Sequence, residues 1–352
     1  KGVNHVVDTI TDINVGENGN IVSVGRKNGP PLDGDLFVDC SGFRSMLLAG
    51  RLQEPFDEFY DYLFNDRAVA MRIPYRDKKN EMLSYTLCEA QSAGWIWTIP
   101  LYSRIGTGYV YCSRYKTEDQ AETEFRQYWG EERVKDVQVS HIKIRVGKHQ
   151  RTWVKNCVAI GLSAGFIEPL ESTGLFIAQG AIQTLGDTLK GRNDYNAGDV
   201  RVYNDSVTRM IEIIRDFLVC HYGLTSREDT QYWRDVKYGT KVSDSLSAKL
   251  QLARLAMPDS QYINRFDNAS LAGFSFGDGW QCILTAMNYL PFDRPFLKLR
   301  GVGPYEPHVI ENMAAADERI NKLRAQAARV GQLPSHYQFL KDNFYNGQDV
   351  DS

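Results

Sequence analysis

The hydrophobic periodicity of this chain changes once, near residue 175, and that change limits the folds the chain can adopt. Before it, apolar and polar residues alternate, as in "HVVDTITDINV" and "IVSVGRK", and Asn18-Gly19 between these segments is a strong hairpin-turn signal. After it, segments such as "IAQGAIQTLGDTL" and "VTRMIEIIRDFLV" space their apolar residues at helical intervals. We therefore predict an α+β chain in which sheets precede a mainly helical part.

Further segments define the predicted domains. Strands are predicted for "AVAMRIPY", "MLSYTLCEA", "GWIWTIP", "GTGYVYCSRY" and "WVKNCVAIG", and an amphipathic helix for residues 118–132. The polar, glycine-containing segment "KGRNDYNAGD" is typical of a connection between domains. We therefore predict one domain over residues 1–190 and a helical, substrate-capping domain over residues 191–352.

Composition narrows the class of protein. The 352 residues are enough for roughly two domains, and a net charge of −3 gives no reason to expect nucleic acid or an anionic membrane as partner. No apolar run approaches the ~20 residues that span a bilayer. The six cysteines are scattered without a CxxC pair, which favours buried free thiols of a reducing compartment, and the histidines form no metal-binding array. We expect a cytoplasmic protein without a metal site.

The segment "PLESTGLFIAQGAIQTL" places an acid, two hydroxyls and a glycine where a helix begins, near Ser172 or Thr173. The first amides of such a helix suit an anion, and Gly174 allows close approach. The same helix end should hold Glu171 as a carboxylate that can accept a proton. The alternative, that "EST" is only a capping sequence, is the commoner outcome on local sequence alone. The residues expected on the buried face of this helix are Leu175, Phe176, Ala178, Ile182 and Leu185.

The strand "GWIWTIP" presents a second candidate site. Successive side chains of a strand point to opposite faces, so Trp95, Trp97 and Ile99 share one side, and Pro100 ends the strand. Two indoles and an isoleucine make a rigid apolar wall that suits a flat aromatic ligand. The alternative is that both tryptophans belong to the core of a sheet.

Two further segments, "DLFVDCSGFRS" and "NCVAIGLSAG", each predict a buried strand that ends in a turn of small residues. Such a turn lets the backbone approach a cofactor closely. The candidate cofactor-binding residues are Gly42, Gly161, Leu162, Ser163, Ala164 and Gly165.

Together these segments resemble the flavin-dependent halogenases of the tryptophan halogenase family. "WIWTIP" matches the W-x-W-x-I-P motif of that family, and "FIEPLESTG" matches the segment around its catalytic glutamate, here Glu171. "DLFVDCSGFRS" and "CVAIGLSAGF" correspond to its flavin-contacting strands, and "HYGLTSREDTQYWRD" to a segment of its helical part. The resemblance covers most of the chain and implies the C-terminal part of a flavin monooxygenase-like FAD-binding fold.

The resemblance also implies a reaction of secondary metabolism. Reduced FAD from a separate flavin reductase, O2 and a halide ion (chloride or bromide) give hypohalous acid, which halogenates an electron-rich aromatic such as tryptophan or another indole. Thr173 and Gly174 would bind the halide through their amides, and Ser172 would orient Glu171. Glu171 would take the proton from the ring. Trp95 and Trp97 would keep the substrate away from the flavin.

The positions that match the substrate-binding residues of the family are Tyr222, Glu228, Tyr232 and Trp233. His221 replaces a tyrosine of some tryptophan enzymes, and Tyr232 stands where phenylalanine is usual, so the resemblance leaves the aromatic substrate open. The alternative, given even weight, is that "QYWRD" only packs helices together.

One family feature is not recognisable in this sequence: the glycine-rich flavin fingerprint with the lysine that follows it. We therefore expect the chain to correspond to the C-terminal two-thirds of a halogenase, to bind FAD poorly and not to halogenate as given. Two other functions remain open, an FAD-dependent aromatic monooxygenase and a non-catalytic aromatic-binding module, and so does a homodimer.

Overall fold

The computed structural model describes residues 2–192, 194–254, 263, 267, 277–289 and 307–349. Contacts divide the chain into unit 1, residues 1–66, 144–250 and 258–288, and unit 2, residues 67–143, 251–257 and 289–352. The predicted boundary near residue 190 falls inside unit 1, between two helices. A domain division at that point stays a prediction, and the contacts group the chain differently.

The elements of unit 1 are β1 (Ile10–Val15), β2 (Ile21–Arg26), β3 (Leu32–Asp33), β4 (Phe37–Asp39), η1 (Gly42–Arg44), η2 (Met46–Arg51), β5 (Phe56–Glu58), β11 (Gly147–His149), β12 (Trp153–Val154), β13 (Cys157–Ala159), η3 (Gly161–Ser163), β14 (Gly165–Phe166), η4 (Leu170–Ser172), α4 (Thr173–Leu189), α5 (Ala197–Gly223), α6 (Gln231–Gly239) and α10 (Gly277–Ala286). Helix α7 (Asp244–Ala253) begins in the same unit. The elements of unit 2 are β6 (Arg67–Ile73), α1 (Lys78–Glu81), β7 (Leu87–Gln91), β8 (Gly94–Pro100), β9 (Ile105–Tyr111), α2 (Glu118–Trp129), α3 (Glu131–Val134), β10 (Ser140–Lys143), α12 (Pro307–Val330) and α13 (His336–Asn343).

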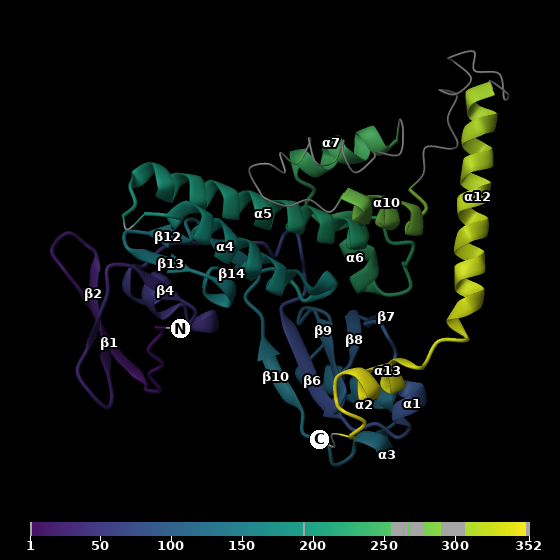
Figure 1. The fold of residues 1–352 in the computed structure, drawn as a ribbon, viewed down its shortest axis with the longest axis horizontal. Helices are drawn as coiled ribbons and strands as arrows, with labels where there is room; N and C mark the ends of the chain where they lie inside the picture. The colour runs from purple at the N-terminus through teal and green to yellow at the C-terminus, as the bar shows by residue number, and fades with distance from the viewer. Residues whose placement is uncertain are drawn as a thin grey trace. The chain divides into compact units, whose positions relative to one another are not determined.

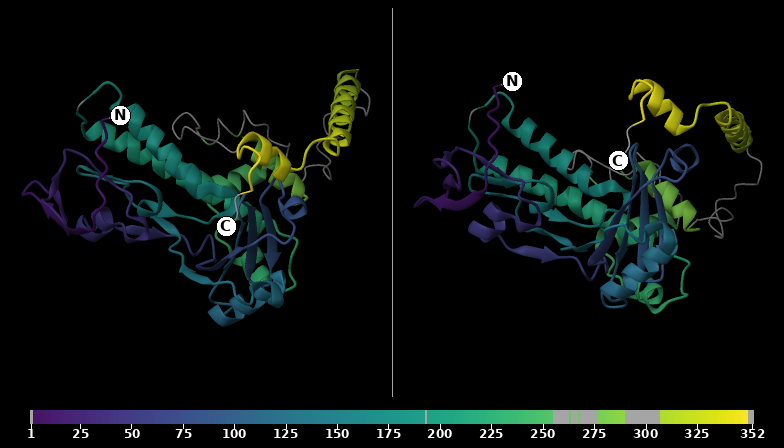
Figure 2. Two further views of the ribbon diagram at one scale, coloured as in Figure 1. Left: turned by 60° about the horizontal axis from the view of Figure 1, so that its bottom comes forward. Right: turned by 90° about the horizontal axis from the view of Figure 1, so that it is seen from below.

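Unit 1 joins small sheets to two long helices. Its described strands form the sheets β1-β2-β3, β14-β11-β5 and β12-β13-β4, and α4 and α5 run side by side (Figures 1 and 2). The hairpin predicted at Asn18-Gly19 is confirmed, since β1 and β2 pair antiparallel around it and Gly19 has φ +81°. This conformation suits glycine because it has no Cβ.

The single strand predicted for "WVKNCVAIG" is wrong. The segment forms two strands, because Trp153 pairs with Val158 and Val154 with Cys157 across a tight hairpin. Lys155 in the turn has φ +55°, a left-handed conformation. The Asn156 side chain fixes the turn by bonding both the N–H and the C=O of Ile21, each at 2.8 Å. Hydrogen bonds to the distant backbone of Ile21 therefore stabilise a turn that the local hydrophobic pattern does not predict.

The face predicted to be buried on α4 is wrong for Leu175 (81% exposed) and Ile182 (60% exposed), and Phe176, Ala178 and Leu185 are only partly buried. The buried residues of this helix are Thr173, Ile177 and Ala181. The reason is close packing against α5: a Cβ added at Gly180 would lie 2.6 Å from the Cε of Met210. Gly180 therefore marks the face of α4 that α5 covers.

Unit 2 is built on an antiparallel sheet in the order β10-β6-β9-β8-β7 (Figure 1). Its core side buries strand residues such as Val69 and Tyr109 against Phe125 of α2. The helix predicted for residues 118–132 is confirmed up to Trp129. A capping box at Thr117 starts it, and Gly130, with φ +83°, separates it from α3.

The six cysteines all lie in the described part of the chain, and all are free. Cys112, Cys157 and Cys220 are buried as predicted; Cys40, Cys88 and Cys282 are exposed, so for these three the prediction of buried thiols is wrong. Over the described ranges, no helix has both the length and the apolar character needed to cross a membrane.

Candidate functional site

The loop from Glu168 to the start of α4 has an unusual backbone. Glu171 (φ 60°, ψ 17°) and Ser172 (φ 57°, ψ 26°) are consecutive and both left-handed. For residues with a Cβ this conformation costs on the order of 1–3 kcal/mol each, and it persists only where the surroundings enforce it. Such strain is concentrated at functional sites, so the structure singles out the same acid as the sequence.

The predicted start of α4 is confirmed, but its capping differs from a simple cap sequence. Ser172 is the N-cap residue, and its side chain makes no cap hydrogen bond to the helix. The hydroxyl of buried Thr173 instead donates to the carbonyls of Glu168 (3.0 Å) and Leu170 (3.2 Å), which holds the loop against the helix. The leading amides of α4 thus lack a capping side chain, which leaves them suited to an anion.

Backbone strain does not explain why glycine occupies position 174. Its φ is not in the left-handed range, and an added Cβ would make only ordinary contact with the Phe166 ring, at 3.4 and 3.7 Å. An alanine would therefore fit, while covering the space beside the helix start. This makes Gly174→Ala a usable probe of the predicted halide contact.

His221 fixes the protonation state of Glu171. The Nδ1 of His221 lies 2.9 Å from the carbonyl oxygen of Phe217, which can only accept, so Nδ1 carries a proton. The Nε2 lies 3.4 Å from Oε1 of Glu171. The hydrogen bond from His221 lowers the pKa of Glu171, against an opposing effect of burial. Glu171 is thus a carboxylate and His221 its donor.

A chain of buried hydrogen bonds runs behind this loop. The Tyr222 hydroxyl donates to Oε2 of Glu168 at 2.5 Å, and it accepts from Nδ2 of Asn65 at 3.0 Å. The Tyr232 hydroxyl donates to Oδ1 of Asn65, also at 3.0 Å. Glu168, Asn65 and both tyrosines are buried. These hydrogen bonds tie α5 and α6 to the acid loop, because Tyr222 lies in α5, Tyr232 in α6 and Glu168 in the loop.

The predicted substrate residues of unit 1 fall into two groups. Tyr222, Tyr232 and Trp233 form one aromatic cluster, with ring centroids 6.3 Å apart for Tyr222–Trp233 and 5.0 Å apart for Tyr232–Trp233. Their burial and the two engaged hydroxyls support the packing alternative at these positions. Glu228 is instead exposed, with Lys237 and the Tyr238 hydroxyl as partners; the hydrogen bond from Lys237 is the main reason that its pKa is lowered.

The predicted cofactor residues come together at one edge of unit 1. Strands β4 and β13 are parallel neighbours, and their ends lead into η1 and η3, which lie in contact. Gly42 (φ +72°) and Gly161 (φ +75°) start these two turns, and nothing lies within 4 Å of a Cβ added at either. Asp39 holds η2, which follows the first turn, by accepting from the amides of Leu47 and Leu48. The remaining predicted residues, Leu162, Ser163, Ala164 and Gly165, continue the second turn.

Open backbone at the carboxyl ends of parallel strands is where α/β sheets bind cofactors, so these residues fit the edge of a flavin.

The aromatic wall lies in unit 2, on β8. Trp95 and Trp97 are neighbours with ring centroids 6.2 Å apart, and Pro100 is the last residue of the strand, as predicted. Trp95 is buried, Trp97 is partly buried, and Ile99 is 38% exposed. Trp97 pairs with Gly108, where an added Cβ would lie 2.1 Å from the indole. The ring thus lies flat across the neighbouring strand.

Three residues of this region are not identified by the sequence alone: Glu168, His221 and Asn65. The motif contains Glu168 but assigns it no role, and the family resemblance marks His221 only as a departure from tyrosine. Asn65 gave no local signal, because its partners lie more than 150 positions away in sequence. The alternating glycines of "GTGYVY", opposite Ile99 and Trp97, could have indicated the flat ring.

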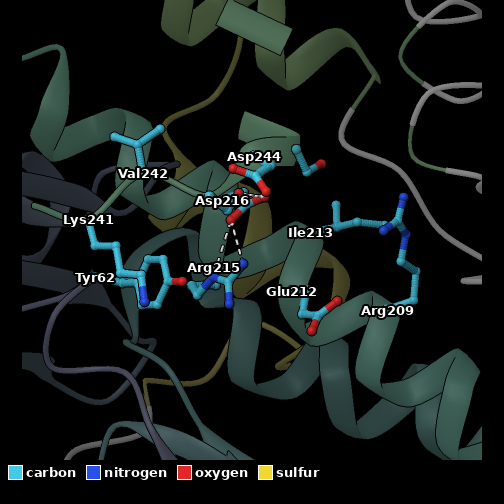
Figure 3. Close-up of a pocket in the computed structure, with 11 residues that line it drawn as sticks. Tyr62, Arg209, Glu212, Ile213, Arg215, Asp216, Lys241, Val242 and Asp244 are labelled. Atoms are coloured by element: carbon cyan, nitrogen blue, oxygen red, sulfur yellow. Dashed lines mark hydrogen bonds and ion pairs between the residues drawn. The ribbon is translucent and has the colours of Figure 1, made fainter. Parts of the chain in front are cut away.

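A cavity of about 400 Å³ in unit 1 contains none of the predicted site residues (Figure 3). Three basic and three acidic residues line it: Arg209, Arg215, Lys241, Glu212, Asp216 and Asp244. Arg215 is already paired with Asp216 at 2.9 Å, and its guanidinium lies 4.2 Å from the Tyr62 ring centroid. The charges that line this cavity balance one another, so the cavity is not the candidate site.

Comparison with known proteins identifies the class of this protein, the flavin-dependent halogenases. The family model described as "Tryptophan halogenase" matches residues 1–299. The chain belongs to the tryptophan halogenase family and has its α+β FAD-binding fold.

Individual relatives show how far the match extends. The 7-chloro-L-tryptophan 6-halogenase KtzR of Kutzneria sp. (strain 744) is 37% identical over 97% of this chain and 63% of its own length. The tryptophan 7-halogenase RebH of Lentzea aerocolonigenes is 35% identical over 97% and 64%. The crystal structure of a tryptophan 6-halogenase (SttH) from Streptomyces toxytricini matches with TM-score 0.83 and 37% identity, over 96% of this chain and 63% of that one. The chain thus spans somewhat less than two thirds of their length.

Proposed function

We propose that this chain carries the acid and the aromatic-binding residues of a flavin-dependent halogenase that acts on an electron-rich aromatic, such as tryptophan or another indole. The observation that carries the proposal is the Glu171 carboxylate, held by His221 in a strained turn at the uncapped start of α4. The family membership supports the reaction class. A separate flavin reductase as partner and a cytoplasmic location belong to the same proposal.

Reduced FAD, when bound, supplies with O2 the oxidising power that turns a halide ion into hypohalous acid. The amides of Thr173 and Gly174 hold the halide, because the partial positive charge at a helix start favours an anion. Oε1 of Glu171 accepts from His221, which leaves Oε2 to take the proton from the halogenated ring. Ser172 shares the strained turn and fixes the direction of Glu171.

The remaining predicted residues have supporting roles in this proposal. The strand-end turns at Gly42 and Gly161–Gly165 hold the edge of the flavin. Trp95, Trp97, Ile99 and Pro100 form a rigid apolar wall that suits an aromatic ring. Tyr222, Tyr232 and Trp233 shape the surroundings of Glu171 through Glu168, and Glu228 contributes an exposed carboxylate for a polar group of the substrate.

The test is an assay of the protein together with a flavin reductase, NADH, O2, bromide and tryptophan or indole. We expect brominated product, recognised by its isotope pattern in mass spectrometry, and a loss of at least about 10²-fold in Glu171→Gln, since general bases contribute on this scale. Glu131→Gln, an exposed acid of α3, serves as the matched control. Gly174→Ala should raise the KM for bromide and leave the fold intact.

Two results would overturn the proposal. Hydroxylated product that forms without halide would favour an aromatic monooxygenase, and absence of turnover with retained indole binding would favour a binding module. The expectation that the 352-residue chain binds FAD poorly is tested separately, by flavin titration. Tight stoichiometric binding would contradict it.

A further inference from the structure

Helix α12 has an exposed apolar stripe. It is one uninterrupted helix of 24 residues, which makes it about 36 Å long (Figure 1). The structure describes the side chains of its second half, and every residue from Glu318 to Val330 is exposed. Among them Ile320 is 44% exposed, Leu323 57% and Val330 62%. Large apolar side chains that lie together on a surface mark a place where another element binds.

The spacing of the apolar residues puts them on one side of the helix. Intervals of four and three residues alternate along the series Val309, Met313, Ala316, Ile320, Leu323, Ala327 and Val330. This alternation has the period of 3.5 residues that keeps a narrow stripe turned toward a partner helix. A helix that packs on a globular core has a wider apolar face. The spacing therefore indicates a seam between two helices.

Packing is also what a helix of this kind needs for its stability. A helix without packing is only marginally stable in water, and most helical stability in proteins comes from burial of the apolar face. An ion pair between Lys322 and Glu318, one turn apart at 2.7 Å, supports the described half of α12. Exposed pairs contribute little, so burial of the stripe against a partner is the larger source of stability.

The charges beside the stripe select the direction of the partner helix. Arg319 and Arg324 flank the stripe, one on each side, in the heptad positions that face a neighbouring helix. In a parallel pair of α12 helices, Arg319 would face the partner's Arg324 on both sides of the seam, and like charges repel. In an antiparallel pair, Arg319 faces the partner's Gln326, and Arg324 faces position 317 of the partner, an aspartate. The charge pattern of α12 is thus complementary to an antiparallel copy of itself.

The apolar residues match in the same antiparallel register. Ile320 meets the partner's Leu323 in both central layers, and Ala327 meets position 316 of the partner, also an alanine. Large residues therefore meet large ones, and small residues meet small ones. A two-fold symmetric interface requires such self-complementarity, because both copies present the same surface.

We propose that α12 is a dimerisation element, which pairs antiparallel with α12 of a second copy of this chain. Ile320 and Leu323 form the centre of the seam, and Arg324 forms charged contacts at its edge. The pairing uses no residue of the candidate functional site, so it does not depend on the proposed function.

Sedimentation velocity of the protein over a range of concentrations tests the inference. We expect a dimer, and we expect Leu323→Glu to raise its dissociation constant at least about tenfold, because a charge then lies in the seam. Ala325→Glu is the matched control, since it adds the same charge to an exposed residue on the far side of the helix, and it should leave the constant unchanged. Arg324→Glu tests the direction: it should weaken an antiparallel dimer, whereas it would tighten a parallel one.

Three results would overturn the inference. A protein that stays monomeric at every concentration would mean that something other than a second copy covers the stripe. Equal weakening by Leu323→Glu and Ala325→Glu would place the interface elsewhere, and a tighter dimer with Arg324→Glu would contradict the antiparallel pairing. Since the substituted residues are exposed, the variants should keep the fold, and their melting temperatures check this. No turnover is measured, so failure of the halogenation assay does not affect the result.

Discussion

The acid loop of unit 1 and the tryptophan strand of unit 2 are constructed in opposite ways. The loop around Glu171 has two left-handed residues in succession, and contacts from Asn65, Tyr222 and His221 hold it in place. The strand from Trp95 to Pro100 has regular pairing throughout. The loop therefore depends on residues distant in sequence, and the strand on its immediate ladder partners.

This difference explains what each region contributes. A regular strand fixes the direction of its side chains through pleating alone, so two indoles can form a wall without strain. The direction of a single carboxylate at a helix start requires a backbone that only long-range hydrogen bonds can maintain. Substitutions should accordingly act through packing in the strand and through polar contacts in the loop.

The largest effect is expected from Gly108→Ala in unit 2. The new Cβ would lie 2.1 Å from the Trp97 ring and 2.7 Å from the carbonyl oxygen of Val69, so the ring or the strand must move. We expect a loss of about 3 kcal/mol in the free energy of unfolding, the upper part of the usual range for overpacking. Denaturant unfolding measures it.

The control for this variant is Gly106→Ala, two residues earlier on the same strand. Its Cβ would make only ordinary contacts, at 3.8 Å, with Ile99 and Leu101. A loss as large as that of Gly108→Ala would show that any side chain on this strand is harmful. The flat ring of Trp97 would then not be the cause.

A smaller effect is expected in the loop from Tyr222→Phe. The change removes the hydroxyl that bridges Glu168 and Asn65, and it leaves both polar groups buried. We expect a loss of about 2 kcal/mol, as for a buried hydrogen bond whose partner remains. Tyr238→Phe, whose hydroxyl bonds exposed Glu228, should cost less than about 0.5 kcal/mol. Equal losses would contradict the role assigned to the buried chain.

The sequence predicted the strand better than the loop, for a physical reason. Alternation is a local property, so the shared side of Trp95 and Trp97 follows from "WIW" directly. The start of α4 was also predicted, since proline and hydroxyl residues mark helix starts locally. The buried face of α4 was not, because Gly180 and its contact with Met210 decide which side α5 covers. Size alone pointed to Leu175 and Ile182, which are exposed.

The loop shows the same limit at the level of chemistry. The sequence identified Glu171 as a carboxylate and attributed its state to the helix end. The structure adds His221, fifty positions away, as the principal cause of the lowered pKa. No spacing rule links the two residues, because the contact depends on the path of α5. Unit 2 is similar: Arg72 and Arg104 are far apart in sequence and line one cavity of about 730 Å³.

The smallest effect in stability, and the most specific one, is expected from His221→Gln. Loss of the hydrogen bond from His221 raises the pKa of Glu171 toward its ordinary value. The carboxylate then protonates at higher pH, so the acid limb of kcat/KM moves to higher pH. A ¹³C NMR titration of the Glu171 carboxyl measures the same shift without turnover. His141→Gln, which breaks a similar pair with Glu122 in unit 2, is the control and should leave Glu171 unchanged.

The same pair sets the pH dependence of stability. A depressed carboxyl pKa in the folded state stabilises the fold above the pKa of the unfolded state, and the contribution disappears as pH falls through the folded value. The difference in melting temperature between the parent chain and His221→Gln should therefore be present at pH 7 and absent at acid pH. A difference that is constant with pH would mean that His221 acts by packing on Phe217 rather than through Glu171. The acid loop would then owe its geometry to apolar contacts rather than to polar ones.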